Sequence, residues 1–525
     1  MKNNISKAIN RVDGKDKISG EAKYIDDVKF KDQLFAKTVR SEIPKGKIVS
    51  IKIPKLPNDY FVIDKNDIPG INRMRTVVSD HPIFAEDEVS YIGQPILLIV
   101  GADREMINKI INDIKIEYIE KKPILSIKEA INNKAIFTEY NYSKGDTEKA
   151  FQEAEMIIED KYQTGYQEHI YIEPQGIVAE FKNDKINIYG SMQCPFFVEG
   201  AIQDVLDWEA DRIRVIHSTT GGAFGGKEEF PSLLACQVAV ASLKTNRPVK
   251  IIYDRNEDII SSTKRHPSII HYKVGLDKNN KITALTIDVN FNAGAFSGIS
   301  PVVLQRGIFS ATGVYNFQNL KVMGKNYKTN TVPCGAFRGF GAPQVLFGIE
   351  MLMTNIAKRL KIKPLDFKKS HLLKSGDITA TNGTIRDEIK LPEMIKIAAK
   401  ISNYEKYSTD KKKFKGIGIS LFLHGCGFTG KGENDIKGKI ILQKIGKKVF
   451  INVSSVEMGQ GAETVLRKIV SYTLSIPIEQ VVYETPDTSK VPNSGPTVAS
   501  RTTMIIGGLL RSASVELNER WNEKN

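Results

Sequence analysis

The chain has 525 residues, of which 41% are hydrophobic and 26% are charged, and its formal net charge is +14. This length fits about three or four domains, and the composition is typical of a globular protein with a large core, which excludes general disorder. A positive charge can indicate a nucleic-acid partner. Lysines nevertheless alternate with acidic residues along most of the chain, so we expect none. The densest lysine run, at 411–415, is predicted to be a solvated loop.

The four cysteines, Cys194, Cys236, Cys334 and Cys426, are widely spaced. None forms a CxxC pair, so the sequence indicates neither a zinc site nor an iron–sulfur cluster in this chain. Free thiols are typical of a reducing compartment. The N-terminus lacks the apolar core of a secretory signal, and no apolar run reaches the roughly 20 residues that a membrane span requires. We therefore expect a cytoplasmic protein without a membrane span.

The first predicted domain covers residues 11–122, where short apolar strands alternate with turns. It includes a buried strand at 94–100, an amphipathic helix at 103–114 and a strand at 115–119. This pattern predicts a compact α+β unit. Residues 121–141 are predicted to form a linker.

The second predicted domain covers residues 144–375. Its centre has the pattern of a strand at 213–217, a glycine-rich loop, a helix ending near Lys244 and a strand at 249–253. The third predicted domain covers 400–525. It contains a strand at 448–454, a helix from about Glu463 and a final helix over 497–521.

The sequence GGAFGGKE at 221–228 places four glycines between a strand and a helix, where bare backbone lets amide groups approach a ligand. Residues Gly221 to Lys227 also satisfy the GxxxxGK spacing of a nucleotide-binding P-loop. A P-loop continues with Ser or Thr, which holds magnesium, whereas Glu228 would repel a phosphate. For this loop alone, a P-loop NTPase and a glycine-rich turn without a ligand remain alternatives.

Three more segments combine glycines with polar side chains. They are CGAFRGFGAPQ at 334–344, SVEMGQG at 455–461 and VPNSGPT at 491–497. In the first of them an arginine stands among the glycines, which suits an anionic or oxo ligand. Several such turns in one chain indicate a large polar ligand that backbone groups bind from many directions.

These segments, in this order, resemble the molybdopterin-binding subunits of the xanthine dehydrogenase and aldehyde oxidase family. Other matching segments are RVDG at 11–14, YIDD at 24–27, VSYIGQP at 89–95, QEHIYIEPQ at 167–175 and SMQ at 191–193. The resemblance covers essentially the whole chain. It implies an α+β fold, with an N-terminal α/β hammerhead domain followed by two molybdopterin-binding lobes. It also implies that the second lobe is incomplete.

The resemblance assigns roles to matching positions. Beside the metal it places Gln193, Phe224, Arg338 and Ala499. The residues implied to bind the cofactor are Gln193, Gly222, Ala223, Phe224, Gly225, Arg338, Met458, Gly459, Gln460, Thr497, Ala499 and Ser500. Three polar or aromatic residues on a strand end are instead expected to serve packing, namely His169, Tyr171 and Glu173.

Three further positions match residues that contact the substrate. Glu228 and Arg306 match an acidic and a basic residue that hold a purine in xanthine-oxidising members, and Phe340 matches an aromatic residue that packs on its ring. A carboxyl group and a guanidinium on opposite edges suit a flat heterocycle with donors and acceptors, whereas an aldehyde needs neither. Leu421 stands where a second aromatic is expected, and Phe422 follows it.

The implied function is that of a molybdenum hydroxylase subunit that oxidises a purine-like N-heterocycle, of the xanthine or hypoxanthine type, with water as the oxygen source. The implied cofactor is molybdopterin with molybdenum, and its cytosine dinucleotide form is an alternative. Because this chain has no iron–sulfur ligands, the electrons must pass to an iron–sulfur subunit, and a FAD subunit is expected beside it.

The resemblance implies that a glutamate acts as general base in a segment beyond Asn525. A second polypeptide of the molybdopterin subunit would then supply this residue, or a premature stop has removed it. In either case we expect no catalytic residue within these 525 residues and no turnover by the chain alone. The alternative function is an inactive remnant that binds the cofactor without turnover.

Overall fold

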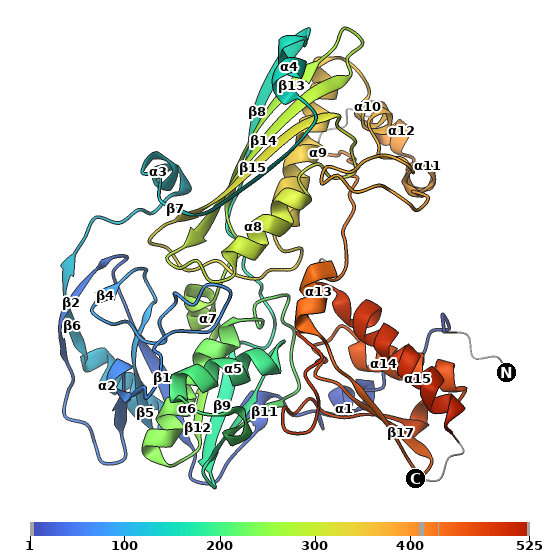
Figure 1. Ribbon diagram of the computed structural model, residues 1–525. Coiled ribbons are helices and arrows are strands. Elements are labelled where there is room, and N and C mark those ends of the chain that lie inside the picture. The colour runs from blue at the N-terminus through green and yellow to red at the C-terminus, as the bar shows by residue number, and fades with distance from the viewer. Residues whose placement is uncertain (1–4, 409–413, 429, 522–525) are drawn as a thin grey trace.

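The computed structural model describes residues 5–408, 414–428 and 430–521. A body built on a five-stranded sheet lies above two others, one of which contains the N-terminal domain and a seven-stranded sheet, and the other the C-terminal residues (Figure 1). Most of the lysine run predicted as a solvated loop, at 411–413, lies outside the described residues. Among the described helices, none combines the length and the apolar character that crossing a membrane requires.

The seven-stranded sheet joins the first two predicted domains. Its strand β1 pairs in parallel with β12, with Leu34 opposite Val249. The N-terminal domain and the first lobe therefore share one continuous sheet. In order across the sheet the strands are β11 (Ile213–His217), β10 (Lys185–Gly190), β9 (Gly176–Lys182), β12 (Val249–Ile252), β1 (Leu34–Arg40), β5 (Pro95–Gly101) and β3 (Phe61–Ile63).

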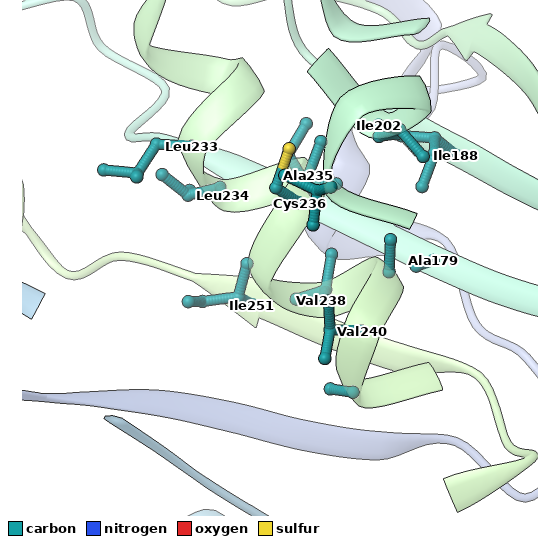
Figure 2. Close-up of a cluster of buried hydrophobic side chains, with 14 of the residues drawn as sticks. Ala179, Ile188, Ile202, Leu233, Leu234, Ala235, Cys236, Val238, Val240 and Ile251 are labelled. Atoms are coloured by element: carbon teal, nitrogen blue, oxygen red, sulfur yellow. The ribbon is translucent and has the colours of Figure 1, made fainter. Parts of the chain in front are cut away.

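Helices α5 (Pro195–Leu206) and α6 (Phe230–Thr245) pack against this sheet. The α6 sequence is apolar on all sides, which is the pattern of a helix buried all round. Its side chains Leu233 and Val238 belong to the same core as Ile188 and Ile251 of the sheet (Figure 2). This core fixes the position of the loop that precedes α6.

The N-terminal domain also has a small sheet and a helix of its own. Helix α2 (Arg104–Asp113) begins where Asp103 accepts a hydrogen bond from the backbone N of Met106 at 2.8 Å, and it buries Ile107 and Ile110. The helix and strands predicted at 94–119 are confirmed. The small sheet contains β4 (Glu88–Val89), β2 (Gly46–Lys52) and β6 (Lys115–Glu120).

The five-stranded sheet forms the body at the top of Figure 1. Helices α8 (Ser300–Phe309) and α9 (Ala342–Arg359) contribute to its core. In order the strands are β7 (Ile136–Lys144), β15 (Asn319–Lys328), β14 (Ile282–Gly294), β13 (Ser268–Leu276) and β8 (Met156–Thr164). The remaining helices of residues 147–408 are α4 (Thr147–Gln152), α7 (Arg255–Ser261), α10 (Pro364–Ser370), α11 (Leu391–Ile401) and α12 (Tyr404–Ser408).

The linker predicted at 121–141 is wrong in part. The segment contains α3 (Ile127–Asn132) and most of the edge strand β7. Ser126 and Glu129 cap α3 reciprocally, each side chain accepting from the other's backbone N. No residue of β7 is fully buried, so its hydrophobic alternation is weak and the strand is hard to recognise in the sequence.

The C-terminal lobe has a three-stranded sheet covered by two helices. The predicted final helix at 497–521 starts later than expected, because Ala499 and Ser500 have positive φ angles of 52° and 55°. A π-helical turn over Thr502–Ile506 then leads into α15 (Gly507–Glu519). The other elements are α13 (Gly430–Ile436), β16 (Ile441–Ile445), β17 (Lys448–Asn452), α14 (Ala462–Leu474) and β18 (Val481–Tyr483).

The N-terminal segment packs on this C-terminal lobe, and α1 (Gly14–Ser19) lies beside it (Figure 1). Arg11 donates from Nη1 to the carbonyl oxygen of Gly459 at 2.6 Å, and the backbone N of Val12 donates to Thr464 Oγ1 at 3.1 Å. Residues that are more than 440 positions apart in the sequence are thus held together.

Candidate functional site

Gln193 connects the first lobe to the C-terminal lobe. It lies between β10 and α5, and its Oε1 accepts from the backbone N of Gly225 at 2.9 Å. Its Nε2 donates to the carbonyl oxygen of Thr497 at 3.0 Å. Its own backbone N donates to the carbonyl oxygen of Lys227 at 2.7 Å. One buried side chain therefore brings the glycine loop at 221–228 and the 497–500 segment to the same place.

The glycine loop requires bare backbone for packing as well as for any ligand. Gly222, Phe224 and Gly225 have φ angles of 92°, 55° and 100°. A Cβ on Gly225 would lie 2.9 Å from the backbone of Ala336 and Phe337. The Phe224 ring is 45% exposed, so the loop presents an aromatic surface to its surroundings.

A buried ion pair lies beneath the glycine loop. The side chain of Lys227 is fully buried, and its Nζ donates to Glu173 Oε2 at 2.9 Å and to Ser191 Oγ at 2.9 Å. Burial lowers the pKa of Lys227, and the neighbouring Glu173 carboxylate opposes that change. Because its ammonium group is already engaged, Lys227 is not free to bind a phosphate. The P-loop alternative is therefore not supported.

The arginine loop, residues 334–344, lies against the glycine loop. The backbone N of Arg338 donates to the carbonyl oxygen of Phe224 at 2.9 Å, and the Arg338 side chain is exposed. Phe340 has a φ of 49° and is partly buried against the apolar cluster that includes Leu421. From the sequence, Phe340 and Leu421 were expected in one substrate pocket. In the structure, Phe340 packs against the apolar cluster to which Leu421 belongs.

The turn at 457–461 is stabilised by its own acidic side chain. The Glu457 carboxylate accepts from the backbone N atoms of Gly459, Gly461 and Glu463 at 2.8, 3.0 and 3.1 Å. Gly459 has a φ of 106°, and a Cβ there would meet nothing within 4 Å. The turn therefore leaves an open stretch of backbone that another molecule can approach.

A hydrogen bond ties this turn to the 497–500 segment. The backbone N of Val456 donates to Thr497 Oγ1 at 2.9 Å. The side chain of Gln460 bonds within the turn, to the backbone N of Met458 at 2.7 Å and to the carbonyl oxygen of Val456 at 2.9 Å. Because Thr497 also contacts Gln193, the turn is linked to the glycine loop of the first lobe.

The three predicted substrate residues are only partly brought together. Arg306 lies on α8, and its Nη2 donates to the carbonyl oxygen of Gly425 at 2.6 Å. Burial, and then repulsion from Glu229, raises the pKa of Glu228 well above the ordinary range of a carboxyl group. In the described part of the chain, no hydrogen bond or ion pair connects Glu228 with Arg306 or Phe340.

Within the described residues, no group of three or more His, Cys, Asp or Glu side chains is arranged to hold a metal ion. The ligands of a metal bound among the described residues would therefore have to come from an organic cofactor that carries the metal. Cavities of about 480 and 470 Å³ lie elsewhere in the structure, and the second of them reaches Pro492 of the 491–497 segment. The first is lined by residues of 26–35, with Arg104 and Lys250, and the second by residues of 438–441 and 509–516.

Family models match nearly the whole chain. Residues 19–122 match the a/b hammerhead domain of aldehyde oxidase and xanthine dehydrogenase, and residues 127–372 and 390–525 each match a molybdopterin cofactor-binding domain. A probable xanthine dehydrogenase subunit of Bacillus subtilis is 30% identical over 509 residues, which cover 94% of this chain and 68% of that protein. The chain belongs to the molybdopterin-binding part of the xanthine dehydrogenase and aldehyde oxidase family.

Longer relatives and solved structures share this architecture. The xanthine dehydrogenase of Blastobotrys adeninivorans is 31% identical over 522 residues, and this chain spans 37% of its length. The aldehyde oxidoreductase of Desulfovibrio desulfuricans has a TM-score of 0.90 at 23% identity, over 98% of this chain and 60% of that one. Quinoline 2-oxidoreductase from Pseudomonas putida 86 has a TM-score of 0.87 at 21% identity, over 99% and 71% of the two chains. The structures show the fold, and the predicted hammerhead domain and two molybdopterin-binding lobes are confirmed.

The residues around Gln193 fit a molybdopterin cofactor. Backbone with positive φ occurs in the glycine loop, the arginine loop and the turn at 457–461, and hydrogen bonds connect these three segments to one another directly or through Gln193 and Thr497. Gln193 uses one N–H of its amide for Thr497, and a primary amide has a second. The specific roles assigned to the cofactor residues from the sequence stay predictions.

Some residues that shape the molybdopterin-binding lobes were not identified from the sequence. Lys227 and Arg11 position loops through buried or long-range contacts, and charged side chains give no local signal of burial. His169 and Tyr171 are both buried, with Tyr171 donating to Asp258 Oδ1 at 2.7 Å, and Glu173 pairs with Lys227, so the packing role expected of all three stays a prediction that their contacts fit.

Proposed function

We propose that this chain is the molybdenum-cofactor-binding part of a hydroxylase that oxidises a purine-like N-heterocycle, of the xanthine or hypoxanthine type, with water as the oxygen source. The observation that carries the proposal is the bridge from Gly225 through Gln193 to Thr497, which brings loops of both cofactor-binding domains to one place. When bound, the cofactor supplies a molybdenum centre that accepts two electrons from the substrate.

In this proposal the chain holds the cofactor mainly through backbone. The second amide N–H of Gln193 would donate to the metal end of the cofactor, and Phe224 and Arg338 would lie beside it. Ala499, whose φ is 52°, would contribute its backbone on the same side. The contacts to the pterin come from Gly222, Ala223, Gly225, Met458, Gly459, Gln460, Thr497 and Ser500. The pterin is molybdopterin itself or its cytosine dinucleotide form.

Substrate recognition is proposed to use one neutral and one charged group. The raised pKa of Glu228 favours the protonated form of its carboxyl group, which can donate a hydrogen bond to a ring nitrogen or carbonyl. Arg306 supplies a cation, and Phe340 a surface for the ring. Leu421 lies in the apolar cluster beside Phe340, where it provides an aliphatic wall in place of a second ring.

The electrons are proposed to leave through partner chains. An iron–sulfur subunit accepts them, and a FAD subunit is expected beside it. The Bacillus subtilis relative is itself named as one subunit of a xanthine dehydrogenase, which supports a complex of several chains. All four cysteines are free, which supports a cytoplasmic location.

The proposal is tested on the chain purified within its native complex. Molybdenum and pterin are measured per chain, together with reduction of a dye in the presence of xanthine or hypoxanthine. Molybdenum, pterin and dye reduction are the expected result. Cofactor without turnover would support the inactive alternative, and a complex that contains neither molybdenum nor pterin would overturn the proposal.

A further inference from the structure

A column of stacked side chains lies beside both cofactor loops. The Arg265 guanidinium carbon lies 3.8 Å from the centre of the Phe337 ring, and Phe337 stacks on His169 with a centroid distance of 4.2 Å and an interplanar angle of 23°. His169 is followed by Tyr171 at 6.0 Å and 27°, and Lys227 Nζ lies 4.7 Å from the Tyr171 ring. A buried cation therefore caps each end of this stacked column.

The stacked column sets the separation of the two loops. A Cβ on Gly226 of the glycine loop would lie 2.7 Å from the Tyr171 ring and 2.9 Å from the His169 ring, so the backbone packs directly on the column. On the other side, His169 Nε2 lies 2.8 Å from the carbonyl oxygen of Ala336 in the arginine loop. A shift of the column would move both loops.

The two cations differ in their charge balance. Lys227 pairs with the Glu173 carboxylate. Arg265 is 7% exposed, and among the described residues no carboxylate pairs with it. Its Nε donates to Gln167 Oε1 and its Nη2 to the carbonyl oxygen of Arg338 at 3.0 Å, while its buried Nη1 has no hydrogen-bond partner. Burial lowers the pKa of Arg265 to about 10, which still leaves the group charged at neutral pH.

The segment that supplies the column is strained. Ile170, between His169 and Tyr171, has a φ of 48°, which is unfavourable for a β-branched residue, and its side chain is 57% exposed. Burial of Ile170 does not compensate for this strain. Such a conformation persists where surrounding contacts over-determine it, which is common at functional sites. Here Arg255 Nη2 donates to the carbonyl oxygens of Tyr171 and Ile172, at 2.6 and 2.8 Å.

We propose that Arg265 is a positioning residue of this site, which fixes the arginine loop on the stacked column and adds an uncompensated positive charge beside the cofactor. The inference rests on the proposed function. A buried charge acts strongly on its neighbours because protein screens it less than water does. The positive charge of Arg265 therefore stabilises the reduced, more negative state of a bound redox centre.

Two substitutions separate the two roles. Arg265→Gln removes the charge and the stacking, whereas Arg265→Lys keeps the charge and loses the planar stack. The control is Arg212→Lys, because Arg212 also lies over an aromatic ring, that of Trp208 at 3.6 Å, but at the opposite end of strand β11 from the glycine loop. Each variant is purified in the native complex. Molybdenum content and the midpoint potential of the molybdenum centre are then measured by metal analysis and spectroscopic titration.

Both Arg265 variants are expected to retain the cofactor with roughly 10-fold lower affinity, as for other residues that orient a metal site indirectly. The midpoint potential shifts to a lower value in Arg265→Gln and stays at the wild-type value in Arg265→Lys and in the control. Wild-type affinity and potential in Arg265→Gln would overturn the inference.

If the Arg265 variants fail to fold, Phe337→Leu tests the stacked column instead. The same loss of affinity for the cofactor is then expected, and a wild-type affinity would contradict the positioning role. Absence of molybdenum from the wild-type complex would instead contradict the proposed function.

Discussion

Gln193 and Thr497 are 304 residues apart in the sequence, yet the amide of the first donates to the carbonyl oxygen of the second at 3.0 Å. The same amide accepts from Gly225. Gln193→Ala leaves the partly buried N–H of Gly225 without this partner, which costs up to about 1 to 3 kcal/mol of the free energy of unfolding. Chemical denaturation measures this loss, and molybdenum content and turnover should fall with it. Gln203→Ala, on helix α5, is the control. Wild-type stability and turnover in Gln193→Ala would contradict both roles of the residue.

Glu228 provides the test of substrate class. Hydrogen bonds between a site and a heterocycle discriminate between substrates far more strongly than the contacts of an apolar pocket do. Glu228→Val should therefore lower kcat/KM for purines by about 10- to 100-fold, the equivalent of one or two lost hydrogen bonds, and spare aldehydes. Glu228→Gln, which keeps a donor, should lose less. An unchanged ratio of purine to aldehyde oxidation would argue against a purine pocket.

The buried pair of Lys227 and Glu173 should dominate the stability of the glycine loop. Lys227→Met leaves the Glu173 carboxylate without its cation, and such a change costs about 3 to 5 kcal/mol. Denaturant unfolding should show this loss, and Lys227→Met with Glu173→Gln should recover part of it. Lys52→Met breaks the exposed pair with Glu117 and should cost far less, because water screens an exposed pair. If the buried and exposed variants were equally stable, the buried pair would have no such role.

Glu229 gives the protein a pH-dependent stability. Burial raises the pKa of its carboxyl group to about 7, from an ordinary value of 4.5. The folded protein therefore binds this proton more tightly than the unfolded chain, and stability is full below about pH 4.5 and falls as the pH rises to about 7. The change corresponds to roughly 3 kcal/mol. Glu229→Gln removes the titration, so its unfolding free energy should vary less over this range and exceed that of wild type at pH 8. An unchanged pH profile would refute the assignment.

Local patterns predicted the elements around the site closely. The strand at 213–217 was placed correctly, and α6 ends within one residue of its predicted end at Lys244, because its apolar run is a local signal. The predicted start of the final helix, at residue 497, is too early, since the helical turn begins only at Thr502. The cause is the positive φ of Ala499 and Ser500, which is rare for residues other than glycine and could not be expected from the sequence.

Contacts across long stretches of sequence could not be predicted from the residues alone. The pairing of Leu34 with Val249 merges two predicted domains into one sheet, and strand partners leave no local pattern. The hydrogen bond from Arg11 to Gly459 likewise joins distant parts of the chain and leaves no local pattern in the sequence. The resemblance named most residues of the candidate site, whereas the supporting contacts of Arg265 appeared only in three dimensions.

The central claim is that loops of both molybdopterin-binding domains surround one metal cofactor. Anomalous diffraction at the molybdenum absorption edge, from crystals of the native complex, locates the metal directly. The account predicts a single strong peak per chain, beside Gln193, Phe224, Arg338 and Ala499. A peak far from Gln193, or no peak in a complex that oxidises its substrate, would contradict it.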